Sequence, residues 1–123
     1  LQKEKNITYD HHVLSKKIPK IPTVEYPATP SFFPVAYSDI DMNKHVNNTR
    51  YVLWAINEYP YEFHQNHKLK TCNIQFISQA KHLDRITIQK KEISENIFVS
   101  SVFTENNQNE ACRIMLAWEK NNK

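Results

Sequence analysis

The chain has 123 residues, a formal net charge of +3, 40% hydrophobic residues and 24% charged residues. This length and composition predict one folded domain with a single core rather than a disordered chain. The absence of glycine excludes glycine-rich phosphate loops, and no apolar run approaches the ~18 residues of a membrane span. The lysines are dispersed, which argues against nucleic-acid binding, although a mildly basic surface could steer an acidic protein partner.

The first residue and the two cysteines indicate whether the chain is processed and in which cellular compartment we expect it. The sequence begins at Leu1 without a secretory segment, so we expect a fragment or a processed product. Cys72 and Cys112 fall in strand-like segments with no paired spacing. This pattern predicts two buried free thiols in a reducing compartment, and we expect a cytoplasmic protein.

Residues 1–31 carry four prolines and lack periodicity, which predicts an extended, linker-like segment before a domain at 32–120. A short first strand is expected over residues 32–37. Asn47 or Asn48 is a suitable N-cap, and apolar residues then recur at helical spacing until Pro60. The pattern predicts one central helix of about three turns.

Four further segments have the period-two alternation of strands. Their alternating residues are Cys72, Ile74 and Phe76; Ile86 and Ile88; Ile97, Val99, Ser101 and Phe103; and Cys112, Ile114, Leu116 and Trp118. Residues 106–109 predict a hairpin turn between the last two. The order of elements is that of an α+β domain, with an antiparallel β-sheet wrapped around one long central α-helix.

The loop before the predicted helix holds Asp41, Asn43 and His45 at alternating positions. In extended backbone these side chains project to a common side. A carboxylate, a carboxamide and an imidazole together suit chemistry on a carbonyl group. Each also has a structural interpretation, because Asp and Asn are common turn formers and a single His is often a surface residue.

Other polar residues are weaker candidates. His64 and His67 are spaced as metal ligands on a helix would be, but no third ligand is evident, so we expect neither a metal nor another cofactor.

Residues 38–54 contain the run DIDMNKHVNN, followed by Tyr51 and Trp54. Together with Pro60, His67, Leu69 and the segment 74–76, this region resembles the hotdog-fold thioesterases that act on acyl chains bound to acyl carrier protein (ACP) in bacteria and plastids. The resemblance covers about the last ninety residues and is to the second, C-terminal hotdog domain of that family.

The resemblance implies that Asn43 and His45 handle the thioester carbonyl while Asp41 orients its neighbours. Backbone N–H groups at the helix start would stabilise the oxyanion, and the acyl chain would lie beside the central helix. Substrate binding is accordingly expected at Val46, Asn47, Asn48, Tyr51 and Trp54.

One departure from the family affects the chemistry. The family has a carboxylate after the next strand, proposed to activate water, and often a cysteine beside it, whereas this chain has Gln79 and Ala80. A glutamine has no group that titrates near neutral pH. Either Asp41 serves as the base, with Gln79 orienting water, or the chain has lost hydrolysis and kept acyl binding or dimerisation.

The resemblance therefore implies a hydrolase that releases free fatty acid from acyl-ACP or acyl coenzyme A thioesters in fatty acid biosynthesis. Because the family pairs two hotdog domains, we expect a homodimer or pairing with a missing N-terminal hotdog domain.

Overall fold

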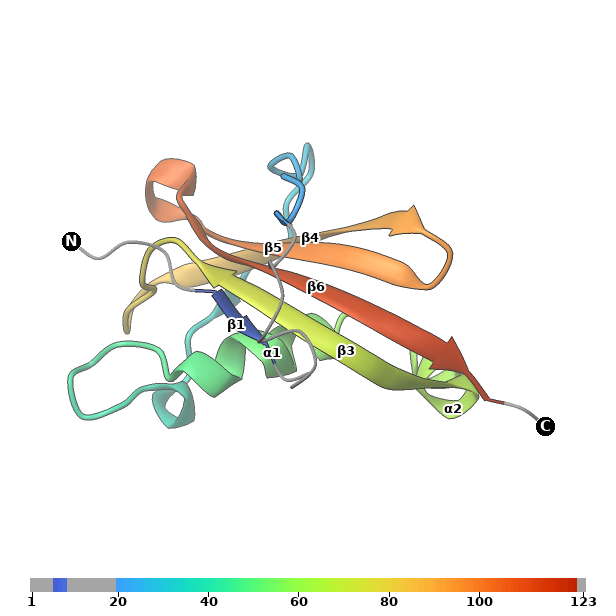
Figure 1. The fold of residues 1–123 in the computed structure, drawn as a ribbon. Helices are drawn as coiled ribbons and strands as arrows, with labels where there is room; N and C mark the ends of the chain where they lie inside the picture. Colours follow the sequence, from blue (N-terminus) through green and yellow to red (C-terminus); the bar gives the residue numbers. More distant parts are fainter. Residues whose placement is uncertain (1–5, 9–19, 122–123) are drawn as a thin grey trace.

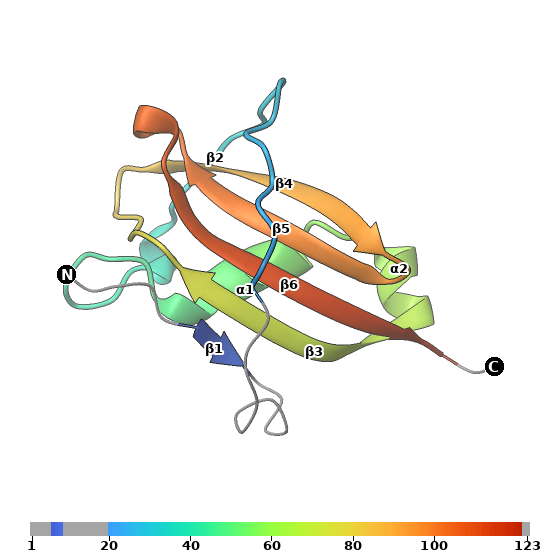
Figure 2. The same cartoon turned by 45° about the horizontal axis from the view of Figure 1, so that its top comes forward.

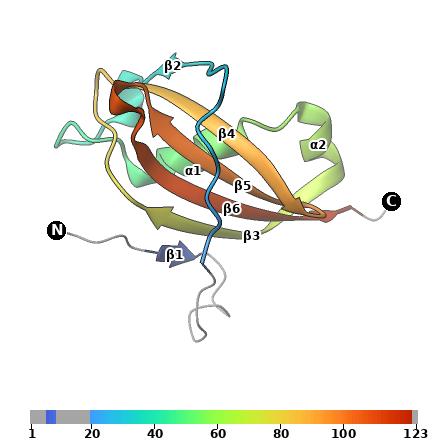
Figure 3. The ribbon, with the colours of Figure 1, turned by 90° about the horizontal axis from the view of Figure 1, so that it is seen from above.

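The computed structural model describes residues 6–8 and 20–121, and within them two short helices precede four long strands along the chain (Figure 1). They are β1 (Asn6–Thr8), β2 (Phe33–Pro34), the 3-10 turn η2 (Tyr37–Asp39), α1 (Asn48–Ile56), α2 (Tyr61–Asn66), β3 (His67–Phe76), β4 (Arg85–Ser94), β5 (Ile97–Thr104), the 3-10 turn η3 (Asn106–Gln108) and β6 (Glu110–Lys120). The strands form one antiparallel sheet in the order β1-β3-β6-β5-β4-β2. The sheet curves over α1, as the hotdog fold requires (Figure 3).

The core lies between α1 and the concave face of the sheet. Alternate residues of β3, β4 and β6 point to this face, as the sequence predicts. They include Cys72, Ile74, Ile86, Ile114 and Leu116, packed against Tyr51 and Ala55 of α1. In β5 the predicted set is on the other face: Val99 packs against Ile21 and Val24 outside the sheet, and Val102 faces the core. The four predicted strands and the helix over them are confirmed.

Three elements differ from the prediction. The first strand is only Phe33–Pro34, since Pro34 has no N–H to extend the ladder and the chain then enters η2. The central helix ends at Ile56, so it is shorter than three turns. The polar stretch after Pro60 forms the unpredicted helix α2, with Pro60 as its N-cap residue.

Residues 20–31 cross the outer face of the sheet rather than hanging free (Figure 2). Ile21 and Val24 are buried there in a small second cluster with Val99. The Arg113 guanidinium also donates a hydrogen bond of 3.3 Å to the Ile21 carbonyl. The extended backbone predicted from the prolines thus covers apolar sheet surface. The division into a 1–31 extension and a 32–120 domain stays a prediction, and residues 1–5 and 9–19 lie outside the described part.

Both cysteines are buried free thiols, as predicted. Burial raises the pKa of Cys72 to about 12 and raises that of Cys112 well above its ordinary value. Within residues 6–8 and 20–121, no helix is long and apolar enough to cross a membrane.

Candidate active site

The loop from Asp41 to His45 is a tight turn organised by one carboxylate. Asp41 Oδ1 accepts hydrogen bonds from the Asn43 N–H at 2.9 Å and the His45 N–H at 3.1 Å. The Asp41 N–H in turn donates to the His45 carbonyl, and Lys44 has a left-handed φ of 66°. Asp41 therefore fixes the backbone from which Asn43 and His45 project.

The helix start follows directly and is capped by Asn47, one of the two predicted caps. The Asn47 Oδ1 atom accepts from the Thr49 N–H at 3.0 Å and from its hydroxyl at 2.9 Å. The Asn47 N–H donates to the Asp39 carbonyl at 2.7 Å. Asn48 is the first residue of α1. The cap holds the helix N-terminus against the end of the His45 loop.

The segment after β3 is joined to the same loop. The Val46 N–H donates to the Ala80 carbonyl at 3.0 Å, and an isolated antiparallel bridge pairs His45 with Lys81. The fold thus brings the neighbours of Gln79 to the motif. Gln79 is exposed and Ala80 is fully buried. Among the described residues, the Gln79 side chain makes no hydrogen bond to His45.

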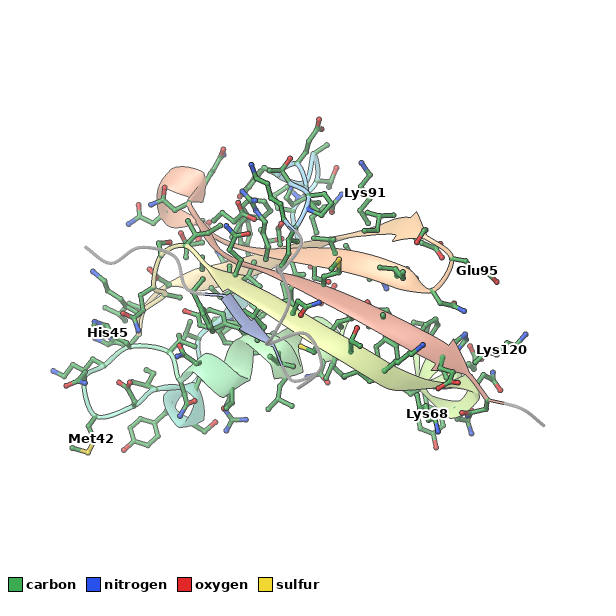
Figure 4. The ribbon with its side chains drawn as sticks, viewed as in Figure 1. Met42, His45, Lys68, Lys91, Glu95 and Lys120 are labelled. Atoms are coloured by element: carbon green, nitrogen blue, oxygen red, sulfur yellow. The ribbon has the colours of Figure 1, made fainter. Side chains whose placement is uncertain are left out.

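The polar side chains of the motif are accessible. Asp41 and Asn43 are exposed, and His45 is half-buried. In Figure 4, His45 and Met42 lie on different sides of the loop, and Met42 is 96% exposed. In the part of the chain that the structure describes, neither the Asn43 carboxamide nor the His45 imidazole has a hydrogen bond. Both side chains are therefore available to a ligand.

Backbone donors at the helix start are fewer than the sequence suggested. The N–H groups of Val46, Asn47 and Thr49 already donate to protein acceptors. Within residues 43–50, only the Asn48 N–H has no acceptor in the described structure. The Val46 and Asn47 N–H groups are therefore committed to protein acceptors, and the contribution of the helix start to oxyanion binding stays a prediction that falls on the Asn48 N–H.

Tyr51 and Trp54 belong to the core beneath the site. Tyr51 is 1% exposed, and its hydroxyl accepts the Ala80 N–H at 2.9 Å. Burial raises the pKa of Tyr51 to about 12, an effect that the Ala80 hydrogen bond partly offsets. Trp54 is 8% exposed and packs edge-on against Tyr51 and Phe33. Their assignment to substrate binding stays a prediction.

The histidine pair at the other end of α1 has a structural explanation. A ring nitrogen of His64 donates to the Ile56 carbonyl, and one of His67 donates to the Phe63 carbonyl, both at 3.0 Å. The His67 ring also stacks on Phe63 with 3.9 Å between centroids. The described residues hold no cluster of three potential metal ligands.

A surface depression of about 480 Å³ lies outside the motif. It is lined by Leu83, Asp84, Arg85, Glu105 and Asn106, and the Arg85–Glu105 ion pair spans part of its wall. None of the predicted site residues lines it.

Sequence reasoning missed the importance of Asp39 and Arg50. Asp39 is 8% exposed and pairs with Arg50 at 3.4 Å, which ties η2 to the first turn of α1. The available signal was an aspartate directly before the apolar Ile40, because a carboxylate that becomes buried beside apolar residues needs a partner.

Comparison with known proteins identifies the family of this chain. The sequence model of the acyl-ACP thioesterase C-terminal domain matches residues 26–120. The chloroplastic oleoyl-acyl carrier protein thioesterase of Coriandrum sativum is 30% identical over 95 residues, which cover 75% of this chain and 26% of that protein.

Solved structures share the fold. An acyl-ACP thioesterase from Bacteroides thetaiotaomicron has 27% identity and a TM-score of 0.71, covering 83% of this chain and 42% of that one. The 12:0-ACP thioesterase from Umbellularia californica has a TM-score of 0.72 at 17% identity, covering 85% of this chain and 40% of that one.

The chain spans about a quarter of the length of the plant relatives it matches. The family match covers the motif loop, α1 and all four long strands. This chain therefore belongs to the acyl-ACP thioesterase family of thioester hydrolases, and its hotdog domain corresponds to the C-terminal domain of that family.

Proposed function

We propose that this protein hydrolyses fatty acyl thioesters carried by acyl carrier protein and releases free fatty acid in fatty acid biosynthesis. One observation carries the proposal beyond family membership. Within residues 6–8 and 20–121, the side chains of Asn43 and His45 make no hydrogen bond to the protein, and Asp41 holds the loop beneath them. A rigid backbone that presents unengaged polar groups suits a reacting carbonyl.

The proposed reaction uses water as the nucleophile. The carbonyl oxygen of the thioester accepts hydrogen bonds from the Asn43 carboxamide and the His45 imidazole, and the free Asn48 N–H adds a donor at the positive end of α1. Water adds to the carbonyl carbon, and the tetrahedral intermediate collapses as the carbon–sulfur bond breaks. The proton lost by water reaches a base, and the departing thiolate is protonated to the thiol.

We assign the base to Asp41. Its Oδ1 atom is engaged by two backbone N–H groups, and its Oδ2 atom has no hydrogen bond within the described residues. Gln79 follows the strand that leads back to this loop and is exposed, so its carboxamide would orient the water. Since a general base typically contributes about 10²–10⁴-fold, hydrolysis would be slow if Asp41 replaced the missing carboxylate imperfectly.

The acyl chain is proposed to lie beside α1. Val46, Asn47 and Asn48 would meet the thioester end, and Tyr51 and Trp54 would meet the apolar chain. Val46 and Tyr51 are each 1% exposed, so this contact requires the chain to enter between α1 and the sheet. The hydrocarbon would then replace protein–protein contacts with equally apolar ones.

A second candidate is a catalytically impaired acyl-binding or dimerisation domain. The observation that favours it is the chemistry at residues 79 and 80, where a carboxamide is exposed and a methyl group is fully buried. Neither can activate water or act as a nucleophile. In this case Asp41 only stabilises the turn, through its hydrogen bonds to the Asn43 and His45 N–H groups.

Pairing with another hotdog domain, either a second copy or a missing N-terminal one, is part of the proposal. Strand β1 pairs with β3 only from Asn73 to Gln75, which leaves the rest of that edge without a described partner strand. Leu53, Leu69 and Ile77 are each about 40% exposed on α1 and around β3. An open edge flanked by apolar side chains favours association. Light scattering coupled to gel filtration would measure it, and a monomer at all concentrations would contradict a homodimer.

Hydrolysis of acyl-ACP and acyl coenzyme A substrates tests the two functions. The enzyme hypothesis expects turnover above the buffer rate that falls in His45→Ala and Asn43→Ala. If the purified protein gives no turnover yet binds acyl-ACP, the impaired acyl-binding function is supported. Activity that survives both substitutions would overturn the site assignment while leaving the enzyme assignment in place.

A further inference from the structure

We propose that Tyr51 is a positioning residue whose hydroxyl fixes the backbone of the His45 loop, and with it the position of the His45 imidazole at the thioester. The proposal rests on the thioesterase function above and gives a defined role to a side chain that the sequence suggested only as a substrate contact. Tyr51 lies in the first turn of α1, and its ring is 1% exposed. Its hydroxyl is therefore placed to act on the backbone beneath the site, apart from any contact that its ring makes with the acyl chain.

A continuous chain of hydrogen bonds leads from this hydroxyl to the motif. Tyr51 Oη accepts the Ala80 N–H at 2.9 Å, and the Ala80 carbonyl accepts the Val46 N–H at 3.0 Å. Val46 directly follows His45, and His45 stands opposite Lys81 in the bridge between the two segments. The hydrogen bond between the Tyr51 hydroxyl and the Ala80 N–H thus joins α1 to the segment after β3, which in turn holds the His45 loop. We call this hydrogen bond the anchor.

The anchor is buried and has no substitute among the described residues. Ala80 is fully buried, so its N–H would lose its acceptor without the hydroxyl, and an unsatisfied buried donor drives local rearrangement. The Tyr51 ring is fixed by edge contacts to Trp54 and Phe76, with centroids 5.4 and 5.9 Å away. The hydroxyl therefore has a defined position, and a change there is transmitted to the loop.

The chain also supplies a matched control. Tyr59 is 5% exposed, packs among aromatic rings and, like Tyr51, has a pKa raised by burial to about 12. Its hydroxyl lies beside the Trp118 indole and makes no hydrogen bond to Ala80 or to the His45 loop in the described structure. Tyr59→Phe removes the same atom from an equally buried ring without touching the His45 loop.

Kinetics of Tyr51→Phe and Tyr59→Phe on acyl-ACP form the first arm of the test. Since a misplacement of about 1 Å can cost about 100-fold, we expect kcat to fall about tenfold in Tyr51→Phe with KM almost unchanged. Tyr59→Phe should keep both values. If Tyr51 acts through His45, Tyr51→Phe should have no further effect in a His45→Ala background. An unchanged kcat in Tyr51→Phe overturns the proposal.

A second arm uses NMR and does not depend on activity. Amide exchange of Ala80 should be slow in the wild type and about tenfold faster or more in Tyr51→Phe, with shifted His45 ring signals. Tyr59→Phe should change neither. Rapid Ala80 exchange in the wild type, or unmoved His45 signals in Tyr51→Phe, overturns the positioning role. Absence of wild-type turnover would instead overturn the thioesterase function, and the NMR results would still decide the role of Tyr51.

Discussion

The guanidinium of Arg50 lies 3.4 Å from the carboxylate of Asp39, and this pair joins the chain before the motif to the first turn of α1. The other Asp39 carboxylate oxygen accepts the Ala36 N–H at 2.8 Å, and the Asp39 carbonyl accepts the Asn47 N–H. The Asp39 side chain is 11% exposed, so solvent screens these contacts only weakly. Asp39 thereby holds the two ends of the motif loop.

Asp39→Ala should destabilise the protein by about 1–3 kcal/mol, because it leaves the Ala36 N–H and the Arg50 guanidinium without their partner. Urea unfolding measures this change. The matched control is Glu105→Ala, which breaks an ion pair whose side chains are 52% and 45% exposed and should cost at most about 1 kcal/mol. Equal losses in the two variants would show that Asp39 is no more than a surface partner.

Two substitutions separate the structural and chemical roles of Asp41. Asp41→Asn keeps an oxygen that can accept the Asn43 and His45 N–H groups but removes the charge, whereas Asp41→Ala removes both. If Asp41 is the base, Asp41→Asn should lower kcat by about 10²–10⁴-fold with little loss of stability. Asp41→Ala should lower stability as well. Full activity in Asp41→Asn would show that Asp41 only stabilises the turn and is not the base.

The fold was predictable where one physical rule acts alone. The alternation at Cys72, Ile74 and at Ile114, Leu116 places one face of each strand on the core, and the structure buries all four residues. Helix α2 was not predictable from pattern, because its short sequence is mostly polar. Its stability comes from tertiary contacts such as Phe63 against Trp118, with centroids 5.1 Å apart.

The residue types of the site were predictable from the sequence, but their hydrogen-bond partners were not. Alternating spacing identified Asp41, Asn43 and His45, yet their roles depend on which backbone groups are already bonded. Contacts between distant segments, such as Val46 with Ala80, set that pattern. Period and spacing contain no information on such long-range partners, so the loss of the Val46 N–H as a donor could not be foreseen.

Gln79→Glu should increase hydrolysis. The side chain is exposed, so a carboxylate there needs no buried partner, and a general base contributes up to about 10²–10⁴-fold. Because the base must be ionised, the gain should appear as pH rises through the ordinary glutamate pKa of about 4.3. Steady-state kinetics between pH 4 and 8 measure it. Gln65→Glu on α2 is the control, and an equal gain there would assign the effect to net charge.

Stability should fall in alkaline solution because buried acids resist ionisation. Burial raises the pKa of Cys72 from 9.0 to about 12, and those of Tyr51 and Tyr59 from 10.0 to about 12. The unfolded chain ionises first, so their contribution is full below pH 9.0 and is lost as pH rises toward 12. Each group accounts for up to about 1.4 kcal/mol per pH unit within its window.

Urea midpoints measured from pH 8 to pH 11 give this alkaline slope. Tyr59→Phe should make the slope shallower, because it removes one of the buried groups whose pKa is raised. Tyr37→Phe should not, because Tyr37 is 93% exposed. A midpoint that stays constant to pH 11 would show that these groups ionise as easily in the folded protein as in the unfolded chain.

Residues 20–31 should contribute to stability although their sequence resembles a linker. Ile21 is 2% exposed on the outer face of the sheet, where it packs in one cluster with Val99 and Met115. Truncation of a buried Ile leaves a cavity and typically costs about 2–5 kcal/mol, so Ile21→Ala should lower the urea midpoint clearly. Thr23→Ala, an exposed site in the same segment, should change stability by about 0.5 kcal/mol or less. A loss in Ile21→Ala as small as that in Thr23→Ala would mean that the segment leaves the sheet in solution.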